Sequence, residues 1–207
     1  MRRLAGVLFL LGVVPLLQAD VEVIDFEGLS DGTSVTNQYP EIFFSNATVL
    51  TAGVSLNELD FPPNSGVNVV FDDGGPISIS FSLPVTSFGG YFTYAEPLTL
   101  QAFDASNNVL DTANSQFTDN VANGDGGVAG SSPNEFIEVS SLTDIAEVTI
   151  TGDPGGGSFV LDDATITTPT TVPEPSSAPF CIATLALIGF VARKRLRRQQ
   201  NNGFRRS

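Results

Sequence analysis

The side chains in this chain that could do chemistry are almost all carboxylates. The 207 residues include 23 Asp and Glu, no His and one Cys, Cys181. A Ser–His or Cys–His nucleophile pair is therefore excluded, because both need an imidazole as base. A zinc hydrolase lacks its imidazole ligands for the same reason. The residue types leave open a carboxylate pair that cleaves a glycosidic bond, and carboxylates that bind a hard cation such as Ca²⁺.

The aromatic residues argue against the glycosidase. Sugar clefts usually offer aromatic platforms, but the chain has no Trp, and its polar aromatic residues are Tyr39, Tyr91 and Tyr94. A carboxylate-dependent glycosidase is therefore the weakest alternative. We predict that the protein is not an enzyme and has no catalytic residues.

The basic residues are confined to the two ends of the chain. All nine lie there, namely Arg2, Arg3, Arg193, Lys194, Arg195, Arg197, Arg198, Arg205 and Arg206. All the acidic residues lie between Asp20 and Glu174. This middle part repels nucleic acids and anionic lipid headgroups, so we exclude nucleic acid as a partner. Its carboxylates have no basic side chain to pair with, and small cations are their natural counterions.

Both ends of the chain have sequence features typical of targeting segments. Residues 1–19 begin with a basic Met1-Arg2-Arg3, continue as an apolar run and end at Ala19, which is the layout of a secretory signal peptide. At the other end, residues 169–177 form a Thr/Pro linker, residues 178–192 an uncharged apolar segment, and residues 193–207 a basic tail. We predict that 178–192 is a transmembrane helix whose basic tail stays in the cytoplasm.

The C-terminal segments resemble the PEP-CTERM sorting signal of Gram-negative bacteria. The resemblance rests on the motif Pro173-Glu174-Pro175, the apolar segment after it, and the basic stop cluster Arg193, Lys194, Arg195, Arg197 and Arg198. It implies recognition of the motif by exosortase, a membrane-embedded protease. It also implies an inner-membrane-anchored precursor that is passed on to the cell surface or to the exopolysaccharide matrix.

The middle of the chain, residues 20–168, reads as one all-β domain. Apolar and polar residues alternate with period two in Ile77–Leu83 and Leu98–Phe103, and shorter versions occur at Phe136–Val139 and Val148–Ile150. Phe159–Leu161 opens the last strand, which continues to Ile166. Many short strands with frequent turn signals predict an antiparallel β-sandwich, and we favour a jelly roll.

Turn residues predict how these strands connect. We expect hairpin turns at Asp72–Pro76, at Ser106–Asn108 and at Gly152–Gly157, and a long loop from about Thr118 to Pro133. Ser141–Ile145 could form one helical turn at most.

The ends of this domain resemble calcium-containing jelly rolls of the carbohydrate-binding-module type. The resemblance rests on the opening segment Ile24–Leu29 and the closing segment Phe159–Ala164. It implies that the first and last strands lie side by side and that Glu27, Asp162 and Asp163 share a structural Ca²⁺. The alternative is that these carboxylates cap strand ends in water.

These observations predict an exported, non-enzymatic protein of the cell surface or the exopolysaccharide matrix. The alternative is a carbohydrate-binding, adhesin-like module that binds extracellular polysaccharide.

Overall fold

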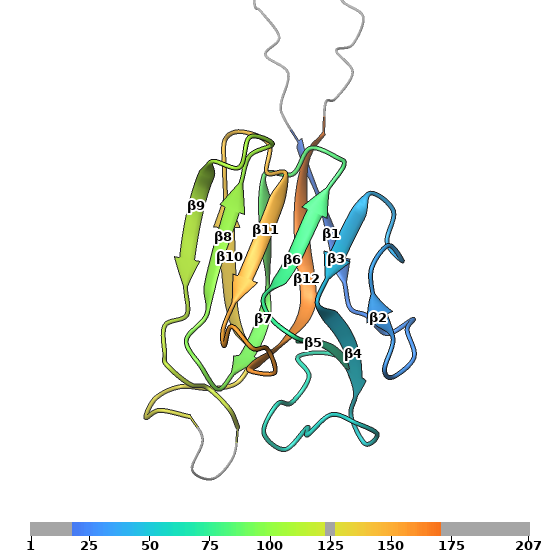
Figure 1. The fold of residues 1–207 in the computed structure, drawn as a ribbon, viewed down its shortest axis with the longest axis vertical. Helices are drawn as coiled ribbons and strands as arrows, with labels where there is room; N and C mark the ends of the chain where they lie inside the picture. The colour runs from blue at the N-terminus through green and yellow to red at the C-terminus, as the bar shows by residue number, and fades with distance from the viewer. Residues whose placement is uncertain (1–17, 123–126, 171–207) are drawn as a thin grey trace, which may run out of the picture. The chain divides into compact units, whose positions relative to one another are not determined.

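The computed structural model describes residues 18–122 and 127–170, and these fold into two β-sheets packed face to face (Figure 1). The seven-stranded sheet has the order β10 (Glu135–Ser140), β7 (Ser87–Tyr94), β12 (Phe159–Thr170), β5 (Asn68–Asp72), β4 (Ala47–Thr51) and β2 (Ser34–Val35), with β1 (Gln18–Ile24) also paired to β12. The five-stranded sheet has the order β3 (Ile42–Ser45), β6 (Ile77–Phe81), β11 (Glu147–Thr151), β8 (Thr99–Phe103) and β9 (Val109–Asn114).

The fold is therefore an all-β antiparallel sandwich, as predicted. Each alternating segment lies wholly or largely in a strand, and most of its apolar residues point into the space between the sheets, while Phe103 and Phe136 point outward. In β6, for example, Ile77 and Ile79 are fully buried while Ser80 is exposed. The first and last strands of the domain, β1 and β12, pair with each other, as the jelly-roll resemblance implies.

Two predicted hairpins are wrong. Residues 72–76 connect β5 in one sheet to β6 in the other, and residues 152–157 connect β11 to β12 in the same way. The two crossings pack on each other, since a Cβ at Gly156 would lie 2.6 Å from the backbone nitrogen of Gly75. Glycine-rich turns allow a sharp change of direction, but they do not specify which sheet the next strand joins. The third prediction is confirmed, because Ser106–Asn108 lies in the turn between the paired strands β8 and β9.

One residue, Asn46, makes a further crossing. It separates β3 in the five-stranded sheet from β4 in the seven-stranded sheet and has a φ of 55°. Asparagine tolerates this left-handed conformation better than most residues. Its side-chain amide donates to the carbonyl of Pro76 (2.9 Å), and its own carbonyl accepts from the backbone N–H of Asp73 (2.9 Å). These bonds hold the β3–β4 and β5–β6 crossings together at one edge of the sandwich.

Aromatic rings fill much of the core between the sheets. Phe26 packs edge-on against Tyr39 and Phe44, and Phe92 packs against Phe159. Neither a helical turn at Ser141–Ile145 nor a membrane-spanning helix of sufficient length and apolarity occurs in the part of the chain that the structure describes. The predicted signal peptide, all but Gln18 and Ala19, and the predicted transmembrane helix lie outside the described residues.

Candidate functional site

The three carboxylates singled out in the sequence meet at one short loop, residues 64–68, which leads into β5. Glu27 holds its C-terminal side, because Oε1 accepts the backbone N–H groups of Val67 and Asn68, both at 2.7 Å. Asp162 holds its N-terminal side, because Oδ2 accepts the N–H groups of Asn64 (2.7 Å) and Ser65 (2.8 Å). We call this arrangement the carboxylate clamp.

Asp163 and Asn68 complete the carboxylate clamp. The carboxylate of Asp163 accepts from the amide of Asn64 (2.7 Å) and from the hydroxyl of Ser65 (2.8 Å). The amide of Asn68 donates to the carbonyls of Phe26 (3.0 Å) and Leu29 (2.9 Å), which ties the loop to the segment that carries Glu27. The clamp therefore joins three segments that are far apart in the sequence.

Backbone conformation lets the acidic groups approach the loop. Phe26 has a φ of 60° and Asp163 a φ of 47°, and Asp163 lies at the irregularity in β12 where its register with β7 shifts. Such values are uncommon for residues other than glycine and concentrate where a structure needs a specific direction. Gly66, with a φ of 53°, leaves open the space that Glu27 occupies, since a Cβ there would clash with Oε1.

The electrostatics of the carboxylate clamp centre on Asp162, which is only 1% exposed. Burial raises the pKa of its carboxyl to about 6. The charge of Asp163 adds to the rise, while the N–H groups of Ser65, Asp163 and Asn64 oppose it. Two adjacent acids without a basic partner favour a cation nearby. However, no group of three or more acidic side chains placed to hold a metal ion occurs among the described residues.

Within the described residues, the carboxylates of the clamp accept hydrogen bonds from backbone N–H, amide and hydroxyl groups of the loop. The resemblance to calcium-containing jelly rolls implies that Glu27, Asp162 and Asp163 share a Ca²⁺. The structure brings the three together, with Glu27 and Asp162 accepting backbone N–H groups of the loop, and the calcium itself stays a prediction. The loop residues Asn64–Asn68 were missed, although Pro62-Pro63-Asn64-Ser65-Gly66 is a strong turn signal.

A second buried acid, Asp72, holds the crossing between β11 and β12. Its carboxylate accepts from the backbone N–H groups of Ser158 (2.9 Å) and Phe159 (3.0 Å), and from the hydroxyl of Ser158 (3.0 Å). Burial raises the pKa of Asp72, and these hydrogen bonds oppose the rise. Asp72 and Asp162 thus both act as acceptors for backbone amides.

The three tyrosines differ in their accessibility. Tyr94 is fully buried and donates its hydroxyl to Glu135; burial and Glu135 raise its pKa to about 12. Tyr39 packs in the core, and burial followed by the charge of Asp25 raises its pKa to about 12. Tyr91 lies partly exposed on the outer face of the seven-stranded sheet, with its ring 5.2 Å from that of Phe136.

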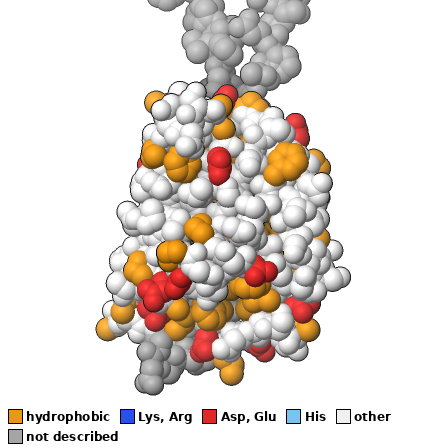
Figure 2. Space-filling view, viewed as in Figure 1, with side chains coloured by type: hydrophobic (Ala, Val, Ile, Leu, Met, Phe, Trp, Pro, Cys, Tyr) orange, Lys and Arg blue, Asp and Glu red, His pale blue; other side chains and the backbone are white. Residues whose placement is uncertain are grey.

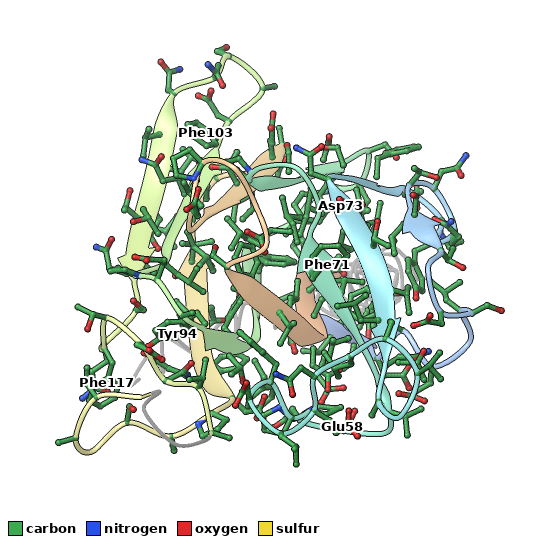
Figure 3. The ribbon with its side chains drawn as sticks, turned by 60° about the horizontal axis from the view of Figure 1, so that its bottom comes forward. Glu58, Phe71, Asp73, Tyr94, Phe103 and Phe117 are labelled. Carbon is green, nitrogen blue, oxygen red and sulfur yellow. The ribbon has the colours of Figure 1, made fainter. Side chains whose placement is uncertain are left out.

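The long loop between β4 and β5, residues 52–67, covers part of that outer face. Its Leu56 packs with Val69 and Val160 into a small apolar cluster that is separate from the main core. Phe71, labelled on β5 in Figure 3, and Phe61 pack against the same cluster, and Glu58 marks the outer turn of the loop. The loop that covers this face is therefore the same loop that the carboxylate clamp holds in place.

The outer face of the five-stranded sheet is open. Figure 2 views the molecule from this side: white surface, which is backbone and side chains that are neither hydrophobic nor charged, covers most of its centre, and most of the acidic side chains in view lie toward the lower end. Glu147 is the acidic residue among the outward-facing residues of β3, β6, β11 and β8.

Comparison with known proteins identifies the C-terminal part of the chain. Residues 171–198 match the model of the PEP-CTERM protein-sorting motif. The match covers the predicted motif Pro173-Glu174-Pro175 and the basic stop cluster, all of which lie outside the described residues. The chain therefore carries a PEP-CTERM sorting signal. No curated protein matches the chain.

Solved structures similar to the sandwich include adhesin domains and carbohydrate-binding modules. The K2 cleaved adhesin domain of Lys-gingipain is 17% identical, with a TM-score of 0.43 over 71% of this chain and 99% of that one. A family 29 carbohydrate-binding module is 13% identical, with a TM-score of 0.39 over 77% and 100%. A module from Clostridium stercorarium in complex with cellobiose is 12% identical, with a TM-score of 0.35 over 66% and 92%. At these identities the similarity concerns the fold alone.

Proposed function

We propose that this protein is exported, processed at its PEP-CTERM signal by an exosortase-type membrane protease, and delivered to the cell surface or the exopolysaccharide matrix. The single observation that carries the proposal is the sorting motif at residues 171–198. The charge distribution supports it, because the basic residues at both ends favour the cytoplasmic side and leave the acidic domain outside.

We further propose that the exported domain is not an enzyme. The buried acids with raised pKa values, Asp72 and Asp162, would be the natural candidates for a general acid. Both instead accept backbone N–H groups that hold loops in place. Carboxylates engaged in this way stabilise the fold and are poorly placed to exchange protons with a substrate.

The sorting proposal is tested with a chain tagged at its C-terminus and expressed in a bacterium that has an exosortase. We expect the wild type to lose the tag and to reach the surface or medium, whereas Glu174→Ala keeps the tag and accumulates in the inner membrane. Glu96→Ala is the matched control, because Glu96 also precedes a proline but lies on an exposed turn of the domain. Identical processing of the wild type and Glu174→Ala, or wild type found untrimmed in the cytosol, would contradict the proposal.

A second candidate function is carbohydrate binding by the sandwich. The observation that favours it is the open face of the five-stranded sheet, which is mainly polar and carries an exposed ring, Phe43, and a partly exposed ring, Phe103. Retardation of the protein in gels that contain soluble polysaccharides tests it. Equal mobility with and without every polysaccharide would remove this function and leave the sorting proposal intact.

Calcium binding at Glu27, Asp162 and Asp163 stays a prediction. The repulsion between Asp162 and Asp163 supports it, since an ion with hard-oxygen ligands would relieve that repulsion. A ligand that binds only the native state stabilises it by about 2.7 kcal/mol at a hundredfold excess over its dissociation constant. Thermal melts with calcium and with a chelator test this, and Asp163→Asn should abolish the difference. Superimposable melts of the wild type would end the calcium prediction.

A further inference from the structure

The outer face of the five-stranded sheet presents polar side chains in a continuous row. Cross-strand register aligns one outward residue from each strand, in the order Ser45, Ser78, Thr149, Gln101 and Thr112. Neighbouring strands are about 4.8 Å apart, so this row is about 19 Å long. It runs across the strands, and we call it the polar row.

Most of these polar groups are unused within the protein. Of the polar row, only Ser78 makes a side-chain hydrogen bond to another described residue, and its partner is Glu147. The side chains of Ser80 and Thr151, on the same face, also make none within the described residues. Hydroxyl and amide groups both donate and accept hydrogen bonds, as sugar hydroxyls do.

A second row beside the polar row supplies aromatic surface. Register aligns Phe43, Ser80, Glu147 and Phe103 across β3, β6, β11 and β8. Phe43 is 46% exposed and Phe103 is partly exposed. Three strand spacings separate them, or about 14 Å. Each ring offers a flat apolar surface on which the C–H face of a sugar can stack.

The outer face of the seven-stranded sheet differs in both respects. Its Thr93 donates to Asn134 (3.2 Å), its Ser87 is bonded to Glu138, and its Thr48 donates to Asp73 (2.9 Å). Its exposed ring, Phe136, packs on Tyr91 and lies over Gly89. The polar groups of that face are committed to the fold, whereas on the five-stranded sheet only the Ser78–Glu147 and Thr99–Asn114 pairs are bonded in this way within the described residues.

The charge of the domain indicates whether its ligand is anionic, cationic or uncharged. No Lys or Arg occurs between Arg3 and Arg193, so nothing on the domain attracts an anionic polymer. Glu147 is the one acid in the two rows, and its hydrogen bond to Ser78 engages it within the sheet. A cationic ligand would therefore meet little complementary charge on this face, whereas an uncharged polyhydroxyl chain would pay no cost for burying an unpaired charge.

We propose that the outer face of the five-stranded sheet binds an uncharged polysaccharide, which lies across the strands along the polar row and stacks on Phe43 and Phe103. The proposal rests on the carbohydrate-binding function proposed above and assigns its site. The strand spacing is close to the length of one hexose unit, so successive sugars meet successive strands. Affinity comes from several weak contacts along the polymer.

The test uses the full-length chain, made in a host without an exosortase and purified in detergent. Mobility is measured in native gels with mixed-linkage β-glucan, xyloglucan, galactomannan or dextran, and with alginate as the anionic polymer. The variants are Phe43→Ala, Phe103→Ala and Gln101→Ala. Phe136→Ala is the matched control, because Phe136 is 44% exposed on the other sheet, close to the 46% of Phe43.

We expect at least one neutral polysaccharide, and not alginate, to retard the wild type. Phe43→Ala and Phe103→Ala should each weaken that binding by about tenfold, and Gln101→Ala by about threefold, as for contacts at the centre of a site. Phe136→Ala should bind like the wild type. Far-UV circular dichroism and melting points confirm that each variant is folded.

Three results would overturn the assignment. Loss of binding in Phe136→Ala, with Phe43→Ala unaffected, would place the site on the seven-stranded sheet and leave carbohydrate binding standing. A preference for alginate would exclude the uncharged ligand. Concentration-dependent dimers that Phe43→Ala dissociates, without glycan binding, would show that a second copy covers this face. Wild type that no polysaccharide retards would instead remove the carbohydrate-binding function itself.

Discussion

The two sheets of the sandwich share one core but use their outer faces differently. On the seven-stranded sheet, a long loop covers part of the face, the carboxylate clamp fixes that loop, and hydroxyls bond to nearby side chains. On the five-stranded sheet, the outward hydroxyl and amide groups largely face solvent. Matched substitutions on the two faces should therefore differ in their effect on stability.

The largest effect is expected for Asp162, in chelator-containing buffer. Its pKa is raised from 3.8 to about 6, so between these pH values the native state binds more protons than the unfolded state. The free energy of unfolding should fall as pH rises from about 4 to about 6, by about 2–3 kcal/mol, and stay level above that. Asp162→Asn should remove most of this fall, measured by urea unfolding at each pH.

Two comparisons make the pH experiment specific. Asp72 also has a raised pKa, so a smaller fall of the same sign should persist in Asp162→Asn. Thr149→Val, on the open face, removes no ionisable group and should retain the full pH dependence of the wild type. An Asp162→Asn curve parallel to that of the wild type would show that Asp162 titrates normally in the native state.

The next effect is expected for Glu27→Ala. It leaves the N–H groups of Val67 and Asn68 without their acceptor, which should cost about 2 kcal/mol in the free energy of unfolding. Glu147→Gln removes an acid of the open face but keeps an acceptor for the hydroxyl of Ser78, and it should change stability by less than about 0.5 kcal/mol. The free energy of unfolding is measured in urea. Equal decreases in the two variants would contradict the conclusion that acidic side chains stabilise the loop on the seven-stranded sheet but not the open face of the five-stranded sheet.

The smallest effect is expected for a pair of threonines. Thr93→Val removes a fully buried hydroxyl that donates to Asn134 and accepts its backbone N–H (3.1 Å), and should cost about 1 kcal/mol. Thr149→Val should be neutral within about 0.5 kcal/mol, because that hydroxyl has no partner in the described structure. Thermal melts of both proteins measure the difference, and a Thr149→Val loss as large as that of Thr93→Val would refute it.

The alternation of apolar and polar residues predicted the strands that have one buried side and one solvent-facing side. It identified β6, β8 and β11, in which buried and solvent-facing residues alternate. It missed β7, the strand between β10 and β12, because seven of its eight residues are buried and it contains two glycines. A strand buried on both faces has no alternation, and glycine weakens its propensity for β-structure.

The candidate site was only half accessible to sequence reasoning. The resemblance of the domain's ends to calcium-containing jelly rolls singled out Glu27, Asp162 and Asp163, and the structure brings all three to one loop. Their partners there are mainly backbone N–H groups, which every residue but proline carries, so no residue type marks them. The polar row is equally invisible without the register that aligns five separate strands.

The carboxylate clamp has a consequence for behaviour in concentrated salt. Ionic strength weakens exposed charge–charge interactions but has little effect on short, partly buried hydrogen bonds. No ion pair between side chains can form in a domain without Lys or Arg, so added salt has no such attraction to weaken. Added salt screens only the mutual repulsion of the acidic side chains, and the domain should therefore become harder to unfold as salinity rises.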